Sequence, residues 1–202
     1  MSLAAIRLRT ERLELRLASH DELVALGELA VAGIHPPEEM PFGIAWTDDV
    51  TVESFVAHHE EAVRVWRPEE WNLHLVVFRD GAPIGVQTIT AREYAATREV
   101  STGSFLGKDH QGQGYGTEQR AAVLELAFRG LGARAALSGA LEGNIASMRV
   151  SEKLGYRVTG MSTISPRGVP VPHTDYRLDV ADWPGYPCDL EGVDPADFGL
   201  RT

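Results

Sequence analysis

Apolar residues recur along the chain at strand or helical spacing, and this pattern predicts its elements in order. Over 11–17, leucines alternate with polar residues, which is typical of a half-buried strand. Residues 19–22 have the form of a capping box, so a helix is expected from there to about residue 32. The other predicted elements are a helix over 50–67, strands over 72–78, 83–90 and 99–106, a helix over 117–128, a strand over 135–141, a helix over 144–154 and strands over 156–163 and 171–180.

The order of these elements predicts one domain around a single sheet. Seven strands and four helices in mixed order, with Asp80-Gly81 as a hairpin turn, indicate an α+β (mixed α/β) domain built on one central sheet. After Trp183, proline, glycine and acidic residues dominate. We therefore expect a domain over 1–183 and an irregular acidic tail over 184–202, ordered only if Trp183 or Phe198 docks.

Charge and cysteine content narrow the function classes. The 202-residue chain has 29 acidic and 19 basic side chains, a formal net charge of −10, which argues against nucleic acid as a partner and suits a cationic one. The single cysteine, Cys188, allows no intrachain disulfide. No stretch resembles a signal peptide or membrane span, so we expect a cytoplasmic protein without a membrane partner. The scattered histidines indicate no metal site. A homodimer is left open.

A glycine-rich elbow between a predicted strand and a predicted helix carries the strongest chemical signal. Its sequence, QGQGYG at 111–116, exposes backbone N–H groups at a helix N-terminus, which suits a phosphate or pyrophosphate. A P-loop would need a GK[ST] ending, which the chain lacks. A dinucleotide fingerprint would need glycine where Thr117 stands, and it would open a βαβ unit rather than follow a hairpin.

The elbow does fit the pattern [Q/R]-x-x-G-x-[G/A], and a second block, EGNIASMRVSEKLGY at 142–156, follows about 30 residues later. In these motifs the chain resembles the GCN5-related N-acetyltransferase (GNAT) superfamily, and its ribosomal-protein N-terminal acetyltransferase (RimJ/RimL-like) branch in particular. The resemblance covers about residues 7–183. It implies a GNAT fold, whose central sheet is mostly antiparallel and contains a splayed strand pair, and acetyl-CoA as donor. The residues MPF at 40–42 and WT at 46–47 resemble a subgroup in which succinyl-CoA is an alternative donor.

Carried over residue by residue, the resemblance implies where the cofactor binds. Elbow amides would hold its pyrophosphate, and the end of the preceding strand would pair with its pantetheine arm. The implied cofactor-binding residues are Phe105, Leu106, Gly107, Gln111, Gly112, Gln113, Gly114, Tyr115, Gly116, Thr117, Asn144 and Ser147. For Asn144, a plain helix N-cap is the alternative role.

The resemblance also implies the catalytic groups of an amine acyltransferase. Ser147 would protonate the departing thiolate, and the backbone amide of Leu106 would stabilise the oxyanion. The general base is not fixed by the sequence: Glu99 is the residue we select, with Glu93, His74 and His173 as further candidates. Substrate contacts are expected from Phe42, Trp46 and Gln87, although a cross-strand hydrogen bond is an equal alternative for Gln87 and a satellite core for the loop aromatics.

Three functions remain in view at this point. The first is direct transfer of an acyl group from acyl-CoA to a primary amine, either a protein N-terminus or a small amine. The second is a non-catalytic acyl-CoA sensor with the same fold. The third, a nucleotide-binding oxidoreductase, predicts NAD(P) binding instead of CoA binding.

Overall fold

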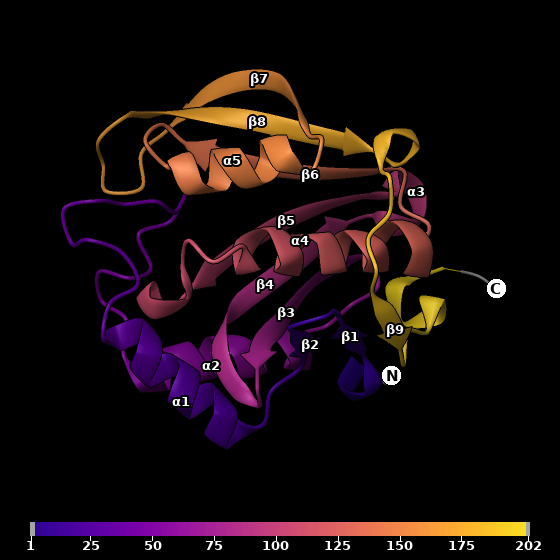
Figure 1. The fold of residues 1–202 in the computed structure, drawn as a ribbon, viewed down its shortest axis with the longest axis horizontal. Coiled ribbons are helices and arrows are strands. Elements are labelled where there is room, and N and C mark those ends of the chain that lie inside the picture. Colours follow the sequence, from indigo (N-terminus) through magenta and orange to yellow (C-terminus); the bar gives the residue numbers. More distant parts are fainter. Residues whose placement is uncertain (1–2, 201–202) are drawn as a thin grey trace.

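One twisted sheet organises the molecule, for which a computed structural model describes residues 3–200. Within that range, nine strands follow the order β7-β8-β6-β5-β4-β3-β2-β1-β9 (Figure 1). Every neighbouring pair is antiparallel except β5 and β6, which run parallel. The strands are β1 (Arg7–Arg9), β2 (Glu14–Arg16), β3 (Glu70–Arg79), β4 (Ala82–Arg92), β5 (Glu99–Leu106), β6 (Ala135–Leu141), β7 (Arg157–Ile164), β8 (Val171–Asp179) and β9 (Asp189–Glu191).

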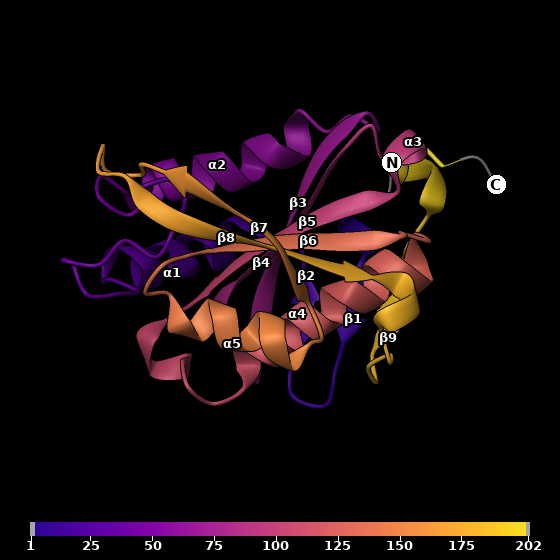
Figure 2. The same ribbon diagram turned by 90° about the horizontal axis from the view of Figure 1, so that it is seen from above.

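Helices cover both faces of this sheet. In the described range they are α1 (His20–Val31), α2 (Val52–Arg64), the single turn α3 (Tyr94–Thr97), α4 (Tyr115–Glu125) and α5 (Ile145–Lys153). Helices α1 and α2 pack on β4 and β3, whereas α4 packs on β1, β4 and β5, and α5 on β6. Figure 2 shows α2 and the α4–α5 pair on opposite sides of the strands. We call these sides the α2 face and the α4 face. No helix among residues 3–200 is long and apolar enough to cross a membrane.

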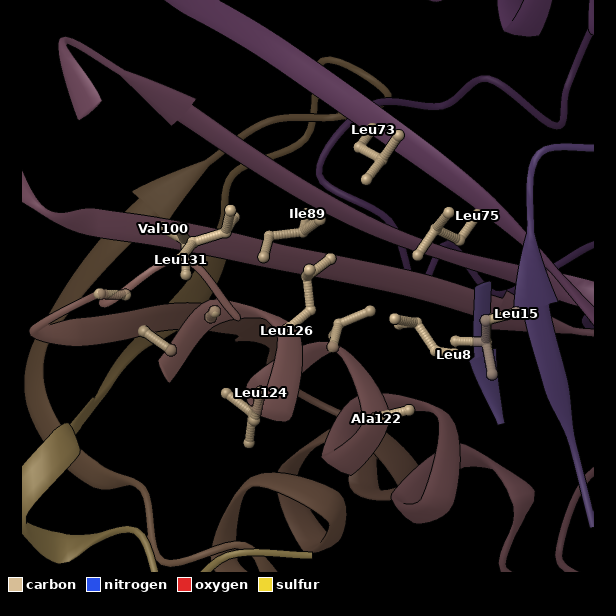
Figure 3. Close-up of a cluster of buried hydrophobic side chains, with 14 of the residues drawn as sticks. Leu8, Leu15, Leu73, Leu75, Ile89, Val100, Ala122, Leu124, Leu126 and Leu131 are labelled. Atoms are coloured by element: carbon tan, nitrogen blue, oxygen red, sulfur yellow. The ribbon is translucent and has the colours of Figure 1, made fainter. Parts of the chain in front are cut away.

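The main hydrophobic core lies between the α4 face and α4 (Figure 3). Strand residues point one way at every second position, so Leu73 and Leu75 enter this core while Asn72 and His74 face α2. The almost fully buried members shown in Figure 3 are Leu8, Leu15, Leu73, Leu75, Ile89, Val100, Ala122, Leu124, Leu126 and Leu131. A second, smaller core beneath α1 and α2 contains Leu26, Phe55, Val76 and Val86.

Capping explains where the first two helices begin. The predicted box before α1 is confirmed: the Ser19 hydroxyl accepts from the Glu22 N–H, and the Glu22 carboxylate accepts from the Ser19 N–H at 2.8 Å. Thr51 and Ser54 form a second box before α2. Each box satisfies backbone donors that a helix N-terminus otherwise leaves unpaired.

The predicted fold class is confirmed, with two strands more than the seven expected and one helix more than the four. The added strands, β1 and β9, have three residues each, which is too short for an alternating pattern to identify. Strand β9 pairs with β1 at the edge of the sheet, so the acidic segment after residue 183 joins the same sheet. Residues 1, 2, 201 and 202 of the expected domain and tail lie outside the described residues.

Docking of that C-terminal segment depends on two aromatic residues and one buried carboxylate. The Phe198 side chain is fully buried and packs against the rings of Trp66 and Trp71. Glu125, also buried, accepts hydrogen bonds of 2.7 Å from Trp183 Nε1 and from the Tyr186 N–H. Trp183 and Phe198, the two residues on which we expected the order of the tail to depend, therefore both dock on the domain.

Candidate active site

The parallel strands β5 and β6 separate along their length. They pair from Glu99↔Ala135 to Ser101↔Leu137, and no pairing follows. Strand β5 continues to Leu106 with β4 as its neighbour, and β6 continues to Leu141 with β8 as its neighbour. In Figure 1 the two strands lie together near α3 and diverge toward the opposite end. We call this opening, bounded by residues 102–106 and 138–141, the splay, which confirms the expected splayed pair.

Side chains on β4 set the direction of the β5 backbone inside the splay. The Gly103 carbonyl accepts from Gln87 Nε2 at 2.9 Å and from Thr88 Oγ1 at 3.0 Å, so it points toward β4. In a trans peptide the carbonyl and the next N–H point in opposite directions, so the Ser104 N–H points into the splay. The same reasoning applies to Leu106, because the Phe105 carbonyl lies against Gly85 of β4. The splay thus presents two backbone donors, those of Ser104 and Leu106.

The elbow at residues 111–116 follows directly from the open end of β5. Gly112 and Gly114 adopt φ angles of +71° and +86°, in the left-handed region that favours glycine. Residues 111–114 are exposed, and the N–H groups of Tyr115 and Gly116 open α4 without an intrahelical acceptor. The positive end of α4 therefore meets an accessible, glycine-lined backbone.

The side chains of the two elbow glutamines donate to carbonyl groups and so support the backbone. Gln111 Nε2 donates to the carbonyls of Ile34 and Leu106, each at 2.8 Å. Gln113 Nε2 donates to the Asp109 carbonyl at 2.6 Å. The Tyr115 ring is buried beneath the Arg12 guanidinium, 4.5 Å from the ring centroid. None of these three side chains needs to contact a ligand.

Arg12 brings a cation to the elbow, which sequence reasoning missed. Its guanidinium lies near Gly114 and donates to the Gln113 carbonyl at 3.2 Å. The buried Glu118 carboxylate holds it through a 2.7 Å bond to Nε, which raises the pKa of Arg12. Because Arg12 belongs to the connection between β1 and β2, no motif near the elbow could indicate it.

The N-cap of α5 lies beside the loop that joins α1 to α2. Asn144 Oδ1 accepts from the Ser147 N–H at 3.1 Å, so the N-cap alternative for Asn144 is what the structure shows. Its Nδ2 donates to the Pro41 carbonyl at 3.0 Å. The Ser147 side chain, one turn into the helix, is part-buried. The cofactor roles of both residues stay predictions.

A buried arginine joins the two limbs of the splay on the α4 face. Arg120 is 4% exposed and points at three serines: its Nη1 lies 3.0 Å from Ser138 Oγ and 3.2 Å from Ser151 Oγ, and its Nη2 lies 3.5 Å from Ser104 Oγ. Nε has no hydrogen-bond partner among residues 3–200. Burial lowers the pKa of Arg120, and no carboxylate is bonded to it in that range. The splay therefore has a positive charge behind it.

The predicted substrate residues lie at different places. In the loop over 32–51, Trp46 packs on Phe105 of β5 and on Phe42, with ring centroids 5.4 and 5.2 Å apart. This loop also reaches the β7–β8 hairpin through an ion pair of 2.6 Å between Asp48 and Arg167. Gln87, in contrast, is fully buried, and the cross-strand alternative describes what it does here.

A cleft of about 670 Å³ opens on the α2 face beside the paired part of β5. Its lining includes His58 of α2, Asn72, Thr90, Glu99, Ser101 and Leu137. The predicted base Glu99 lies four residues from Gly103, about 13 Å along an extended strand. Its carboxylate accepts a 2.6 Å hydrogen bond from Arg177 Nη1. A role as base would require a chain of water molecules.

His74 lies beneath α2, where it contacts two other histidines. Its ring centroid is 4.9 Å from that of His59 and 5.0 Å from that of His58, and neither ring nitrogen has a hydrogen-bond partner among residues 3–200. Burial lowers the pKa of His74 to about 3 and that of His59 to about 4. A base with so low a pKa holds a proton poorly at neutral pH. In residues 3–200 no three His, Cys, Asp or Glu side chains come together as a metal site.

The chain is similar in sequence to known proteins. The sequence profile of the family described as "Acetyltransferase (GNAT) domain" matches residues 12–157. Probable N-acetyltransferase YjcK of Bacillus subtilis (strain 168) is 30% identical over 99 residues, 49% of this chain. The match spans 55% of that curated relative's length.

Several solved structures are similar in fold. RimL, a ribosomal-protein alpha-N-acetyltransferase solved with coenzyme A, has a TM-score of 0.73 at 20% identity, over 84% of this chain and 95% of that one. RimJ of Mycobacterium smegmatis, solved with a CoA disulfide, has a TM-score of 0.73 at 21% identity, over 90% and 88%. The microcin C7 self-immunity acetyltransferase MccE, solved with acetyl-CoA and AMP, has a TM-score of 0.71 at 16% identity, over 84% and 93%.

The matched profile covers well over half of the chain and includes the splay, the elbow and α5. On that ground, the chain belongs to the GNAT acetyltransferase domain family.

Proposed function

We propose that this protein transfers an acyl group from acyl-CoA to a primary amine by direct attack of the amine on the thioester. The observation that carries the proposal is the splay that leads straight into the glycine elbow. An extended ligand with a pyrophosphate at one end and a thioester at the other fits this arrangement. The N–H groups at the elbow, the N-terminus of α4 and Arg12 would bind the phosphates.

Backbone donors in the splay suit the charge that develops during acyl transfer. The amide of Leu106 is the predicted oxyanion donor, and the Ser104 N–H points into the same opening. Donors that are already oriented stabilise an oxyanion without reorganisation. Arg120 behind the splay adds a fixed positive charge close to the position expected for the leaving thiolate. Ser147 remains the proposed proton donor to that sulfur.

The two ligands would approach from different faces. The elbow and α5 lie on the α4 side with the donor, while the cleft on the α2 face is open to an acceptor. The net charge of −10 favours a cationic amine in solution. RimL is named for a ribosomal protein and MccE for self-immunity to microcin C7, and the proposal keeps both a protein N-terminus and a small amine as acceptor classes. Acetyl-CoA is the proposed donor, with succinyl-CoA as the alternative.

Two assays on the purified protein test this proposal. Thermal-shift measurements with CoA, acetyl-CoA, succinyl-CoA and NAD compare ligands, and free-thiol release from each acyl-CoA is then followed with a panel of amines. We expect stabilisation by the CoA species but not by NAD, and thiol release that depends on an amine. Tight CoA binding without release above background on any amine would favour the acyl-CoA sensor. Stabilisation by NAD alone would contradict both.

A further inference from the structure

A histidine–carboxylate pair lies on β8, on the α2 face beside the splay. His173 Nδ1 is 3.1 Å from Asp175 Oδ1 and 3.4 Å from Ser162 Oγ of β7. His173 Nε2 has no hydrogen-bond partner among residues 3–200, and the side chain is 21% exposed. A neutral imidazole that donates from Nδ1 to a carboxylate keeps a free lone pair on Nε2. The pair is thus built to accept a proton at Nε2.

The position of the ring is fixed by a glycine on the β6 limb. A Cβ atom added to Gly139 would lie 2.3 Å from both Cε1 and Nε2 of His173, so the imidazole edge occupies the space that a side chain would need. Gly139 is two residues beyond Leu137, where pairing with β5 ends. At the same level on the other limb stands Gly103, whose peptide presents the Ser104 N–H. Two glycines therefore leave the splay uncovered where His173 overhangs it.

We propose that His173, oriented by Asp175, is the general base that deprotonates the acceptor amine. This inference rests on the proposed acyl transfer and names the group that the sequence could not single out. Nε2 reaches the amine directly or through one water molecule, from the α2 face on which the acceptor cleft opens. Asp175 acts as a positioning residue, because it holds the ring and its tautomer without touching the substrate.

Every proton that leaves the acceptor nitrogen in this reaction has a defined destination. Nε2 takes one proton from the ammonium form of the acceptor, and the neutral nitrogen attacks the thioester carbon. The carbon–sulfur bond then breaks, and the second nitrogen proton passes to the sulfur through Ser147. The imidazolium returns its proton to solvent. The net products are one amide, one CoA thiol and one proton, and no oxidant or further reactant is needed.

The other candidate bases are less well placed. His74 is buried beneath α2 with a pKa of about 3, and Glu99 is engaged by Arg177 in the paired part of β5. Glu93 lies at the exposed turn between β4 and α3, at the far end of the sheet from the elbow. Only the histidine on β8 combines a free acceptor atom with a position at the splay.

The groups that face His173 are few, which makes a pH profile interpretable. Asp175 on its own strand is the charged group bonded to it, and Ser162 of β7 contributes a neutral hydroxyl. From β6, Gly139 and Leu141 face the ring and carry no charge. Arg177, further along β8 on the same face, is neutralised by Glu99 and Asp179.

Substitution of His173 tests the proposal in the full-length protein. For His173→Gln we expect kcat with a lysine-like amine to fall by about 100-fold or more, within the usual range for loss of a general base. CoA affinity, measured by calorimetry, should stay within twofold. In the unsubstituted protein kcat/KM should rise with pH along the acidic limb of the profile as the base loses its proton, and His173→Gln should lack this rise. His20→Gln is the matched control, since His20 forms an exposed pair with Glu60 at 2.9 Å on α1 and α2.

A series of amines separates a base from a merely structural residue. An amine of low pKa is already neutral at pH 7, so its rate should fall far less in His173→Gln than that of a high-pKa amine. Gly139→Ala keeps the imidazole but displaces it, and we expect the same selective loss. Equal rates for His173→Gln and the unsubstituted protein, or an equal loss with all amines, would overturn the proposal. Absence of thiol release from the unsubstituted protein with every amine would instead overturn the acyl transfer itself.

Discussion

At the scale of single residues, the site depends on glycines that leave backbone groups uncovered. Gly103 and Gly139 keep side chains out of the splay, and Gly112 and Gly114 expose the elbow. The donors proposed for the oxyanion are then peptide N–H groups, whose direction is fixed by hydrogen bonds from β4. Backbone donors of this kind are hard to identify from the sequence, because every residue except proline supplies the same N–H group.

Substitution of a glycine in the elbow tests the phosphate site. Gly114→Glu places a carboxylate where a pyrophosphate would bind, and we expect CoA affinity to fall by more than tenfold, or about 1.4 kcal/mol. A glutamate in the left-handed backbone region also destabilises the fold. Gly168→Glu, at φ +76° in the β7–β8 turn, introduces the same strain and charge away from the elbow and is the control. Calorimetric titration with CoA measures the CoA affinity of both variants. Unchanged affinity in Gly114→Glu would remove the pyrophosphate assignment.

Ser147 tests the route of the proton to sulfur. Its N–H is already bonded to the N-cap Asn144, so Ser147→Ala should preserve α5 while removing the hydroxyl. We expect turnover to fall by about tenfold or more with CoA affinity almost unchanged, because a proton donor acts mainly in the transition state. Thiol-release kinetics and CoA titration give the two values. A neutral effect on kcat would reject the acid role.

The buried histidines predict how stability depends on pH. His59 and His74 have pKa values of about 4 and about 3 in the folded protein, below the value near 6.5 of an unfolded histidine. The unfolded state therefore binds more protons as pH falls below 6.5, and folding stability decreases in that direction. Between pH 7 and pH 5 the loss is about 2 kcal/mol for each histidine. Urea unfolding at both pH values measures this loss of stability. His74→Leu should make the free energy of unfolding depend less on pH, and an unchanged pH dependence in this variant would contradict the effect of burial on His74.

At the scale of elements, the sequence predicted those strands and helices that are long enough to show a local pattern of apolar and polar residues. The strands over 99–106 and 135–141 begin and end where predicted, because apolar and small residues run unbroken between clear boundaries. β1 and β9 were missed because three residues carry no period. The elbow was predicted from glycines that are neighbours in the sequence, whereas the positions of Arg12, Arg120 and His173 depend on contacts with distant segments. His173 and Asp175 share a face of the predicted strand over 171–180, but the place of that face over Gly139 depends on the pairing of β8 with β6.

Docking of the C-terminal segment onto the domain contributes to the stability of the fold. Phe198 fills a fully buried position between Trp66 and Trp71, with ring centroids 5.4 and 5.0 Å away. Phe198→Ala should lower the free energy of unfolding by about 3–5 kcal/mol, the range for truncating a buried aromatic residue. Val169→Ala, at a 64% exposed side chain, is the control and should change it little. A loss below about 1 kcal/mol for Phe198→Ala would show that the segment packs loosely.

At the scale of the whole molecule, the proposed donor and acceptor would approach opposite faces of the sheet. The elbow, α4 and α5 would form the donor side, and the cleft and the His173–Asp175 pair would form the acceptor side. The splay is the one place where the parallel strands let the sides meet. This arrangement suits direct transfer, because an amine that approaches from the α2 face can reach the thioester carbon through the splay.

In the proposed complex, acyl-CoA lies along β5 in the splay, with its pyrophosphate on the elbow. Hydrogen–deuterium exchange with and without CoA, resolved to single amides, tests it most directly. We expect protection of the Ser104 and Leu106 amides together with those of residues 112–116, while the already paired amides of β3 stay unchanged. Protection at the elbow without any at Ser104 and Leu106, or CoA-dependent protection confined to another part of the chain, would contradict the account.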